Sequence, residues 1–334
     1  MKKKILALAQ VVVGLLLLGF IFWKLQHSGE LDKFIVALRQ AAGNWPLLLI
    51  AVACVGVCIF LCVQRWNLIL RAQGFVLPFH RLSALYFVGQ FFNAFMFGAT
   101  GGDLVKAYYV ASETHHRKTE VVSTVFIDRL IGLIGLMILT GFVMVFRLPF
   151  FLSTAPTRVA LVINLVQLLG ATAGIVAMAR KNVFEQWPSF RRLEQRTSLG
   201  QVLARGYGAF QFCLRDPALL VKTTLLSIVN HIGFIVCIFY LGLALDVRMS
   251  FLDCLTVFPV INTVAALPIT PSGLGTRESM CMYLLGVFGV SAGKAVTLSL
   301  FMYGSILVWS LAGGLVYFFY IYLRGRTPPK DIAE

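Results

Sequence analysis

Six long apolar segments leave this chain few ways to fold. Each is at least 21 residues long, and they cover residues 5–25, 45–70, 121–146, 158–179, 217–243 and 295–323. A helix crosses the hydrocarbon core of a bilayer with about 20 residues. Lipid offers no hydrogen-bond partners to the backbone, so segments of this kind must be helical. Only 13% of the residues are charged, whereas a water-soluble protein has about 25%. The sequence therefore predicts an all-α polytopic membrane protein with about six full transmembrane helices.

Two further apolar regions, residues 82–111 and 253–289, are interrupted by helix-breaking residues. The first contains "GATGGD" at residues 98–103, and the second contains "PITPSGLGTRE" at residues 268–278. Most of the flanking pieces are too short for a full crossing, so each region forms either one broken crossing or a re-entrant hairpin. With hairpins, the cytoplasmic gaps hold 19 Lys and Arg and the outer gaps 7, whereas single crossings give 12 and 14. Because cytoplasmic loops are enriched in Lys and Arg, we expect two re-entrant hairpins.

The order of span, hairpin and span occurs twice along the chain, and the two hairpins enter from opposite sides. This pattern predicts an inverted repeat, an architecture that many transporters use. We expect one membrane domain over residues 1–334. Its parts are a first helix with an interfacial elbow, repeat 1, a linking helix with a basic cytoplasmic segment, repeat 2 and a cytoplasmic tail, at residues 1–43, 45–146, 158–215, 217–323 and 324–334.

Two segments have the character of membrane-surface helices. In "ELDKFIVALRQA", residues 30–41, apolar side chains recur at helical spacing between charged ones, which predicts an amphipathic helix on the outer surface. Residues 180–215 are basic and form either a helix on the anionic cytoplasmic leaflet or a solvated loop.

Six ionisable residues fall inside the predicted membrane segments: Asp103, Lys106, Asp128, Arg129, Arg277 and Glu278. Each costs about 2.5–3.5 kcal/mol at the bilayer centre, so pairing or a functional role must compensate. Asp103 and Lys106 stand one helical turn apart and can neutralise each other. The pairs expected across the repeats are Asp103–Arg277, Glu278–Lys106 and Glu278–Arg129.

Glycine and proline in the two breaks place a helix start at each hairpin tip. New helices are expected after Gly101-Gly102 and after Pro271-Ser272-Gly273. Helix N-termini carry unpaired N–H groups and a partial positive charge, and glycine lets an anion approach the backbone. With Lys106 and Arg277 within a turn of these starts, the two tips form a candidate phosphate site near the middle of the membrane.

Three stretches resemble the lysylphosphatidylglycerol synthetase transmembrane-region family, the flippase-like domain: "FFNAFMFGATGGDLVKAYYV", "STVFIDRLIGLIGL" and "LPITPSGLGTRESM". The resemblance covers nearly the whole chain and implies a multi-pass protein that handles lipid. Some members move aminoacylated phosphatidylglycerol between leaflets, and others are tied to polyprenyl-linked glycans. The family pattern falls on Asn93, Gly101, Gly102, Asp103, Asp128, Arg129, Pro268, Pro271, Gly273, Gly275 and Glu278.

This sequence departs from the family pattern in several places. Lys106 stands where an arginine is usual, which weakens bidentate phosphate recognition. Residues 97–100 lack the proline often found before the paired glycines. The chain ends in "RGRTPPKDIAE" without a soluble aminoacyl-transferase domain, so we expect it not to aminoacylate what it moves.

Residues and resemblance together favour a lipid transporter, a flippase or scramblase. It would move an anionic phospholipid or a polyprenyl-phosphate-linked lipid through a phosphate-binding cavity at the midplane. The expected partners are membrane lipids with anionic head groups, and a homo-oligomer is left open. We expect a prokaryotic plasma (inner) membrane location, both termini cytoplasmic, and no cofactor, metal or catalytic residue. Nucleic acid is excluded because the Lys and Arg lie mainly between apolar segments, as topogenic charges do.

The alternative is an integral membrane transferase or phosphatase acting on polyprenyl-phosphate-linked substrates. In that case Asp103, Asp128 and Glu278 would supply a base or hold a metal. His231 is the one histidine expected at depth, and on an apolar helix it is expected to be a packing residue.

Overall fold

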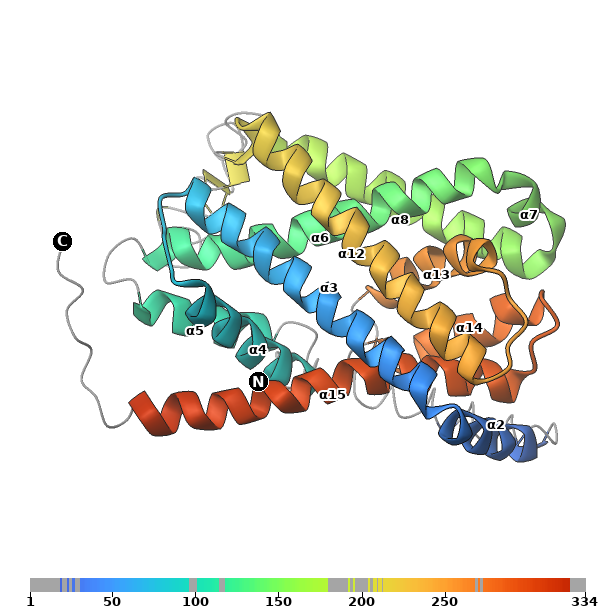
Figure 1. The fold of residues 1–334 in the computed structure, drawn as a ribbon. Coiled ribbons are helices and arrows are strands. Elements are labelled where there is room, and N and C mark those ends of the chain that lie inside the picture. The colour runs from blue at the N-terminus through green and yellow to red at the C-terminus, as the bar shows by residue number, and fades with distance from the viewer. Residues whose placement is uncertain are drawn as a thin grey trace.

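The computed structural model describes residues 31–95, 101–113, 118–179, 213–267 and 273–324, with isolated positions between and before these ranges. The described residues form eleven α-helices and no strand (Figure 1). The helices are α2 (Leu31–Gly43), α3 (Trp45–Ala72), α4 (Phe79–Phe95), α5 (Gly101–Glu113), α6 (Lys118–Phe146), α7 (Leu148–Ser153), α8 (Ala155–Ala179), α12 (Pro217–Ala244), α13 (Phe251–Ala265), α14 (Thr276–Gly286) and α15 (Ala292–Arg324). The all-α class is therefore confirmed.

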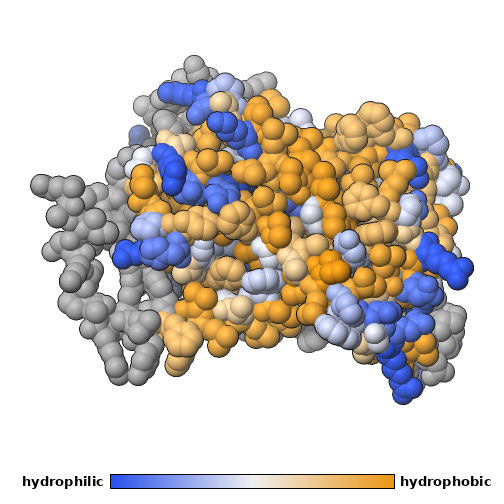
Figure 2. Space-filling model, viewed as in Figure 1, coloured by the Kyte–Doolittle hydropathy of each residue, from blue (hydrophilic) through white to orange (hydrophobic). Residues whose placement is uncertain are grey.

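Five helical segments in the described ranges are long and apolar enough to cross a membrane: Trp45–Ala72, Glu120–Phe146, Ala155–Ala177, Pro217–Ala244 and Ala292–Phe319. They correspond to five of the six predicted spans. The first predicted span, residues 5–25, lies outside the described residues apart from isolated positions. Figure 2 shows apolar side chains over the middle of one face and polar ones mainly toward its two ends. The chain is a polytopic membrane protein.

The helices follow each other in two sets of the same order, long, short, short and long: α3–α6 and α12–α15. The two leading helices, α3 and α12, lie side by side and run in opposite directions (Figure 1). The short helices α4 and α5 lie toward one end of the long helices, and α13 and α14 lie toward the other. Contacts are also matched, because α4 packs on α15 as α13 packs on α6, and α5 packs on α6 as α14 packs on α15.

Outside these sets, the predicted surface helix at residues 30–41 is present as α2. The basic segment 180–215 falls mostly outside the described residues, so its two interpretations stay open.

The breaks in the two short pairs occur where the sequence predicts them. Helix α5 begins at Gly101, and α14 begins at Thr276. Before α14, Gly273 has a φ of +72°, and a Cβ there would lie 3.0 Å from the backbone oxygen of Ala265. Only glycine fits this left-handed position at no steric cost. The chain therefore returns directly over the last residue of α13.

Helices α6 and α12 cross almost in backbone contact. The carbonyl oxygen of Gly132 accepts a hydrogen bond from Ser227 Oγ at 3.2 Å and lies 3.0 Å from His231 Nε2. One turn further on, a Cβ at Gly135 would lie 2.3 Å from Ser227 Oγ. Small residues permit such close approach between membrane helices. This crossing fixes α6, and the charged residues that it carries, against α12.

Candidate functional site

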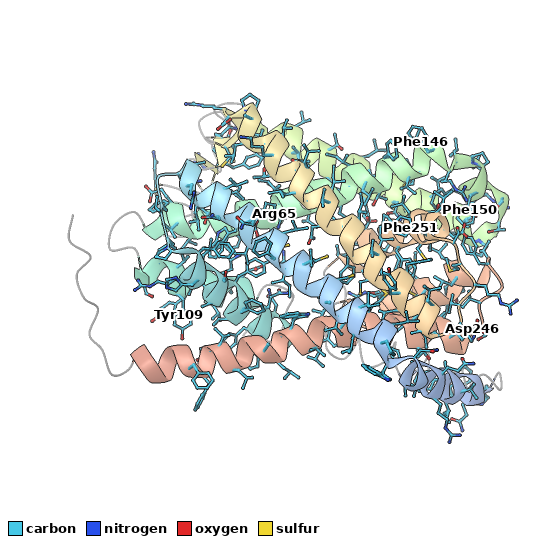
Figure 3. The ribbon with its side chains drawn as sticks, viewed as in Figure 1. Arg65, Tyr109, Phe146, Phe150, Asp246 and Phe251 are labelled. Atoms are coloured by element: carbon cyan, nitrogen blue, oxygen red, sulfur yellow. The ribbon has the colours of Figure 1, made fainter. Side chains whose placement is uncertain are left out.

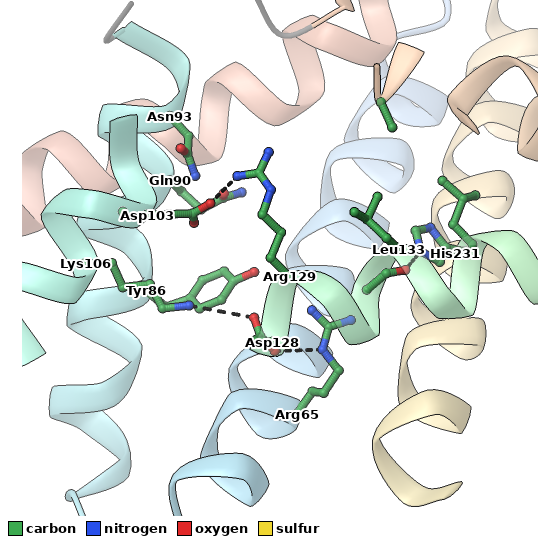
Figure 4. A pocket seen from close by; sticks show the side chains of 14 residues that line it. Arg65, Tyr86, Gln90, Asn93, Asp103, Lys106, Asp128, Arg129, Leu133 and His231 are labelled. Carbon is green, nitrogen blue, oxygen red and sulfur yellow. Dashed lines mark hydrogen bonds and ion pairs between the residues drawn. The ribbon is translucent and has the colours of Figure 1, made fainter. Parts of the chain in front are cut away.

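A pocket with a volume of about 290 Å³ lies between α3, α4, α5, α6 and α12 (Figure 4). Ionisable side chains dominate its wall: Arg65, Lys106, Arg129, Asp103 and Asp128. With their usual charges, three cations face two carboxylates and leave one positive charge in excess. Figure 3 places Arg65 in the half of the molecule that holds Tyr109 of α5, away from Asp246 and Phe251. The pocket therefore belongs to the first of the two short helix pairs.

Asp128 of α6 is shared between two cations. Nε of Arg65 donates a hydrogen bond to Oδ1 of Asp128 at 2.8 Å, and Nζ of Lys106 lies 3.8 Å from Oδ2. The side chains of Arg65, Lys106 and Asp128 are 6%, 4% and 6% exposed. A buried ion pair is stable only when its groups are well paired, because removing charges from water is costly. One carboxylate must here serve two buried cations.

Two aromatic rings supply the rest of the environment of Lys106. Its Nζ lies 3.8 Å from the ring centroid of Trp66 and 4.3 Å from that of Tyr86. Nε1 of Trp66 donates to Thr124 Oγ1 at 3.0 Å, which holds the indole in place. The faces of aromatic rings attract cations. The rings therefore stabilise a buried ammonium group that has no close carboxylate of its own.

Arg129 is the most accessible of the three cations. Its guanidinium pairs with Asp103 of α5, and its side chain is 38% exposed, against 14% for Asp103. An ion pair that retains contact with solvent gains little net energy. Arg129 can therefore exchange Asp103 for another anion at low cost.

At the start of α5, a backbone N–H group is already hydrogen-bonded to a side chain of the same protein. Gly102 N–H donates to Oδ1 of Asn93 at 2.9 Å, and Asp103 occupies the first turn. A Cβ at Gly102 would lie 1.9 Å from the oxygen of Gly89 and 2.5 Å from the nitrogen of Asn93. Glycine is needed here so that α4 and α5 can touch. The expected use of this N–H group for a phosphate is not what the structure shows.

At the start of α14, a backbone N–H group is likewise hydrogen-bonded to a side chain of the same protein. Gly275 N–H donates to Oε2 of Glu278 at 2.5 Å, and Ser299 Oγ donates to Oε1 at 2.7 Å. Glu278 is 0% exposed. A glutamate at the third position of a helix reaches back to the residue before the helix, as in a capping box. This local contact accounts for both oxygens of Glu278.

The expected charge pairs are therefore wrong. Among the described residues, the structure forms none of the pairs Asp103–Lys106, Asp103–Arg277, Glu278–Lys106 and Glu278–Arg129. Asp103 pairs with Arg129, and Lys106 faces Asp128 instead. The reason is that α6 brings Asp128 to the two cations of α3 and α5, and brings Arg129 to the one carboxylate of α5.

The predicted site residues separate into three groups. Five line the pocket: Asn93, Asp103, Lys106, Asp128 and Arg129. Gly101 and Gly102 form the start of α5, next to the pocket residue Asp103, and do not themselves line the pocket. Gly273, Gly275, Arg277 and Glu278 belong to the start of α14 and do not line the pocket, while Pro268 and Pro271 lie outside the described residues. Of the described residues in and between α13 and α14, Ala266, just after α13, is the one that lines the pocket.

Sequence reasoning missed several pocket residues, although the signals were present. Arg65 is an ionisable residue inside the apolar segment 45–70. Tyr86, Gln90 and Asn93 follow at helical spacing, which places three polar side chains on one face of α4. His231 was expected only to pack, and it both contacts the Gly132 carbonyl and lines the pocket. Within the described ranges, no group of three or more His, Cys, Asp and Glu side chains is placed to hold a metal ion.

Long apolar helices around a buried, charged pocket define a polytopic membrane protein with a polar site among its membrane helices. The chain belongs to the family described as "Lysylphosphatidylglycerol synthase TM region", whose model matches residues 7–314. The resemblance seen in the three sequence stretches is thereby confirmed.

Two archaeal membrane proteins are similar to the chain over much of its length. The UPF0104 membrane protein PH1989 of Pyrococcus horikoshii is 23% identical over 321 residues, covering 90% of this chain and 91% of that protein. The UPF0104 membrane protein MJ1595 of Methanocaldococcus jannaschii is 25% identical over 248 residues, covering 70% and 73%. The chain is therefore a multi-pass membrane protein with archaeal relatives.

Proposed function

We propose that this protein moves an anionic lipid between the two leaflets, as a flippase or scramblase, and that the charged pocket holds the lipid head group. The observation that carries the proposal is the excess of cations over carboxylates among the pocket residues. A phosphate diester, with one negative charge, balances this excess, and a phosphate monoester more than balances it. Charge-assisted hydrogen bonds of this kind are roughly twice as strong as neutral ones.

The pocket residues divide the work in this proposal. Arg129 leaves Asp103 to bind a phosphate oxygen, because its pair is the exposed one. Lys106 turns its free donors toward the same phosphate, while Asp128 remains neutralised by Arg65. The head group thus meets two cations, and the carboxylate that loses its partner is Asp103, which is more exposed than Asp128. The two helix starts, where Asn93 accepts from Gly102 N–H and Glu278 accepts from Gly275 N–H, position these side chains rather than binding the anion.

The helix arrangement supports transport rather than static binding. We propose that α4–α5 and α13–α14 are re-entrant hairpins of an inverted repeat, since the two sets share one order and matched contacts. Inverted repeats let a transporter expose one site to either side by rocking one part against another. The positive-inside rule places both termini in the cytoplasm. A prokaryotic plasma membrane is the proposed location.

Membership of the family also favours a lipid substrate. The family description names a synthase of lysylphosphatidylglycerol, which is a phospholipid. We infer that the membrane region common to the family accommodates lipid head groups that contain a phosphate.

The test is transbilayer movement in proteoliposomes. Fluorescent phosphatidylglycerol, phosphatidic acid and a polyprenyl phosphate are each followed with wild type, Arg129→Gln, Lys106→Met and empty vesicles. Losing one charged hydrogen bond costs about 1.5–3 kcal/mol, and each 1.4 kcal/mol is about a factor of ten. We therefore expect each variant to be at least about tenfold slower than wild type.

The matched control is Arg158→Gln, which removes an arginine at the start of α8, where its Nε contacts the Thr154 carbonyl. It is expected to move lipid at the wild-type rate. If wild type is no faster than empty vesicles for any of these lipids, the proposal is wrong. Recovery of a chemically altered lipid would favour the transferase or phosphatase alternative.

A further inference from the structure

A second polar cluster lies where α6, α8 and α13 meet, outside the charged pocket. The hydroxyl oxygens of Thr140 and Thr263 are 2.9 Å apart, and Nε2 of Gln167 donates to the carbonyl oxygen of Thr263 at 3.3 Å. Thr140 is 0% and Thr263 3% exposed. The cluster is thus buried among apolar helices and contains no charged side chain.

Two amide oxygens of α8 have no donor in this cluster. Oε1 of Gln167 and Oδ1 of Asn164 are buried and find no hydrogen-bond partner among the described residues. Asn164 is 0% exposed, and its Nδ2 is used by the Ala160 carbonyl of its own helix at 3.0 Å. An unsatisfied buried acceptor costs about 1–3 kcal/mol. Two of them one turn apart call for a specific explanation.

Asn164 lies on the face of α8 that is turned toward α6 and α13. It stands one turn before Gln167 on the face of α8 that carries the buried residues Ala160 and Leu161. Leu168 on the same face lies 3.8 Å from the Cβ position of Gly141, the residue after Thr140. This face of α8 therefore covers α6 at Thr140 and α13 at Thr263.

Both hydroxyl hydrogens of the cluster are used, and each amide uses one of its two N–H hydrogens. Thr263 Oγ1 donates to the Pro259 carbonyl at 2.8 Å, so the hydrogen between the two threonines comes from Thr140. Gln167 donates to Thr263, and Asn164 donates to Ala160. The unused capacity consists of oxygen lone pairs and one further N–H on each amide, and the lone pairs outnumber the two N–H groups. Such a site attracts a cation or a further donor.

The end of α13 adds a negative potential. Leu267 N–H bonds to the Val264 carbonyl, so the Thr263 carbonyl is left to the side chain of Gln167. The C-terminus of a helix carries a partial negative charge. In transporters built from broken helices, such ends and their freed carbonyls coordinate Na⁺. Divalent cations are usually held with carboxylates, and this cluster has none.

We propose that this cluster binds Na⁺, with five oxygens as ligands: Thr140 Oγ1, Thr263 Oγ1, the Thr263 carbonyl, Asn164 Oδ1 and Gln167 Oε1. Cation binding itself does not depend on the proposed function, but its role does. Ala266, three residues after Thr263, lines the charged pocket. Through the last turn of α13, Na⁺ and the head group favour or disfavour each other's binding, and this coupling is reciprocal.

The experiment measures Na⁺ binding on purified full-length protein in detergent, without lipid transport. Thermal unfolding is followed while NaCl replaces choline chloride at constant ionic strength, with KCl as a parallel series. Ligand binding stabilises the folded state by mass action. We expect a saturable rise in Tm of about 2–4 °C with Na⁺ and saturable binding of radioactive Na⁺.

Two variants remove proposed ligands and one serves as control. Asn164→Leu and Thr140→Val are expected to abolish the Na⁺-dependent rise in Tm and the radioactive binding. Asn164→Leu removes an unsatisfied acceptor, so its Tm in choline chloride should equal or exceed that of wild type. The control is Thr256→Val on α13, because Thr256 is also buried and bonds only to the Leu252 carbonyl of its own helix. It should retain the full response.

Equal Tm in NaCl, KCl and choline chloride, without saturable Na⁺ binding, would overturn the proposal. So would a response to KCl alone, or an undiminished Na⁺ response in Asn164→Leu. Lipid movement is measured separately, so Na⁺ binding without transport, or transport without Na⁺ binding, shows which of the two proposals has failed.

Discussion

Arg65 of α3 donates a hydrogen bond to Asp128 of α6 at 2.8 Å, across 63 positions of the sequence. The same carboxylate lies 3.8 Å from Nζ of Lys106 in α5. One acidic side chain thus connects three helices and neutralises cations from two of them. The wall of the pocket depends on this carboxylate more than on any single cation.

Asp128→Asn is expected to be strongly destabilising, because it leaves Arg65 and Lys106 buried without an anion. Breaking a buried ion pair from one side costs about 3–5 kcal/mol. Thermal unfolding in detergent measures the loss. The comparison is Asp246→Asn, which removes the partner of Lys294 at 3.7 Å in a pair with side chains 64% and 24% exposed and is expected to cost about 1 kcal/mol or less. Equal losses in the two variants would contradict the buried arrangement.

Gly102→Ala is expected to prevent the packing of α5 on α4. The new Cβ would lie 1.9 Å from the backbone oxygen of Gly89, and backbone cannot move aside as a flexible side chain can. Folded yield after detergent extraction, judged by size-exclusion chromatography, should fall sharply. Gly174→Ala in α8, where a Cβ meets nothing within 4 Å, should fold as well as wild type or better. A normal yield of Gly102→Ala would show that the two helices are further apart than described.

Asn93→Ala should leave the Gly102 N–H group without its 2.9 Å partner. The expected loss is about 1–3 kcal/mol in the free energy of unfolding, the cost of an unsatisfied buried donor. Asn93→Asp keeps an acceptor at the same place and should recover most of this loss. Chemical unfolding of the purified variants measures both. If alanine is as stable as aspartate, the side chain does not cap α5.

Glu278→Gln should lower stability rather than act on transport directly. Both oxygens of Glu278 accept hydrogen bonds, from Gly275 N–H and from Ser299 Oγ, and an amide can replace only one of them. We expect a loss of about 1–3 kcal/mol in the free energy of unfolding. Because Glu278 does not line the pocket, lipid movement per folded molecule should stay within about twofold of wild type, far less than the roughly tenfold that 1.4 kcal/mol would give. Ser299→Ala removes one of the same bonds and should behave similarly. Normal stability with abolished lipid movement would instead make Glu278 a transport residue.

Much of the fold follows from the sequence because lipid permits few alternatives. Apolar segments longer than about 20 residues have to be helices, and the Gly-rich breaks at Gly101 and Gly273 have to interrupt them. Both effects are local, so the sequence carries them. For this reason the described spans and the starts of α5 and α14 agree with prediction within a few residues.

Partners of the charged residues are a different matter, since they depend on how the helices pack. The sequence marks Asp103, Lys106, Asp128 and Arg129 as unusual, but not which of them meet. The sequence does not indicate that Arg65 belongs to this group, although Arg65 holds Asp128 by a hydrogen bond. Glu278 was assigned to a distant cation, whereas its own helix start lies three residues away and provides a donor at 2.5 Å. Local hydrogen bonds took precedence over long-range charge in this case.

The crossing of α6 and α12 limits which motions are available to the molecule. Sliding one helix along the other would move Ser227 away from Gly135, where the missing side chain leaves room for it, and separate Ser227 and His231 from the Gly132 carbonyl. We therefore expect these two helices to move together as one rigid unit, so any opening of the pocket has to occur at contacts between other helices. Since α6 carries Asp128 and Arg129, the charged wall is fixed to that unit, and in the proposed transport the short helices would have to move relative to it to give access.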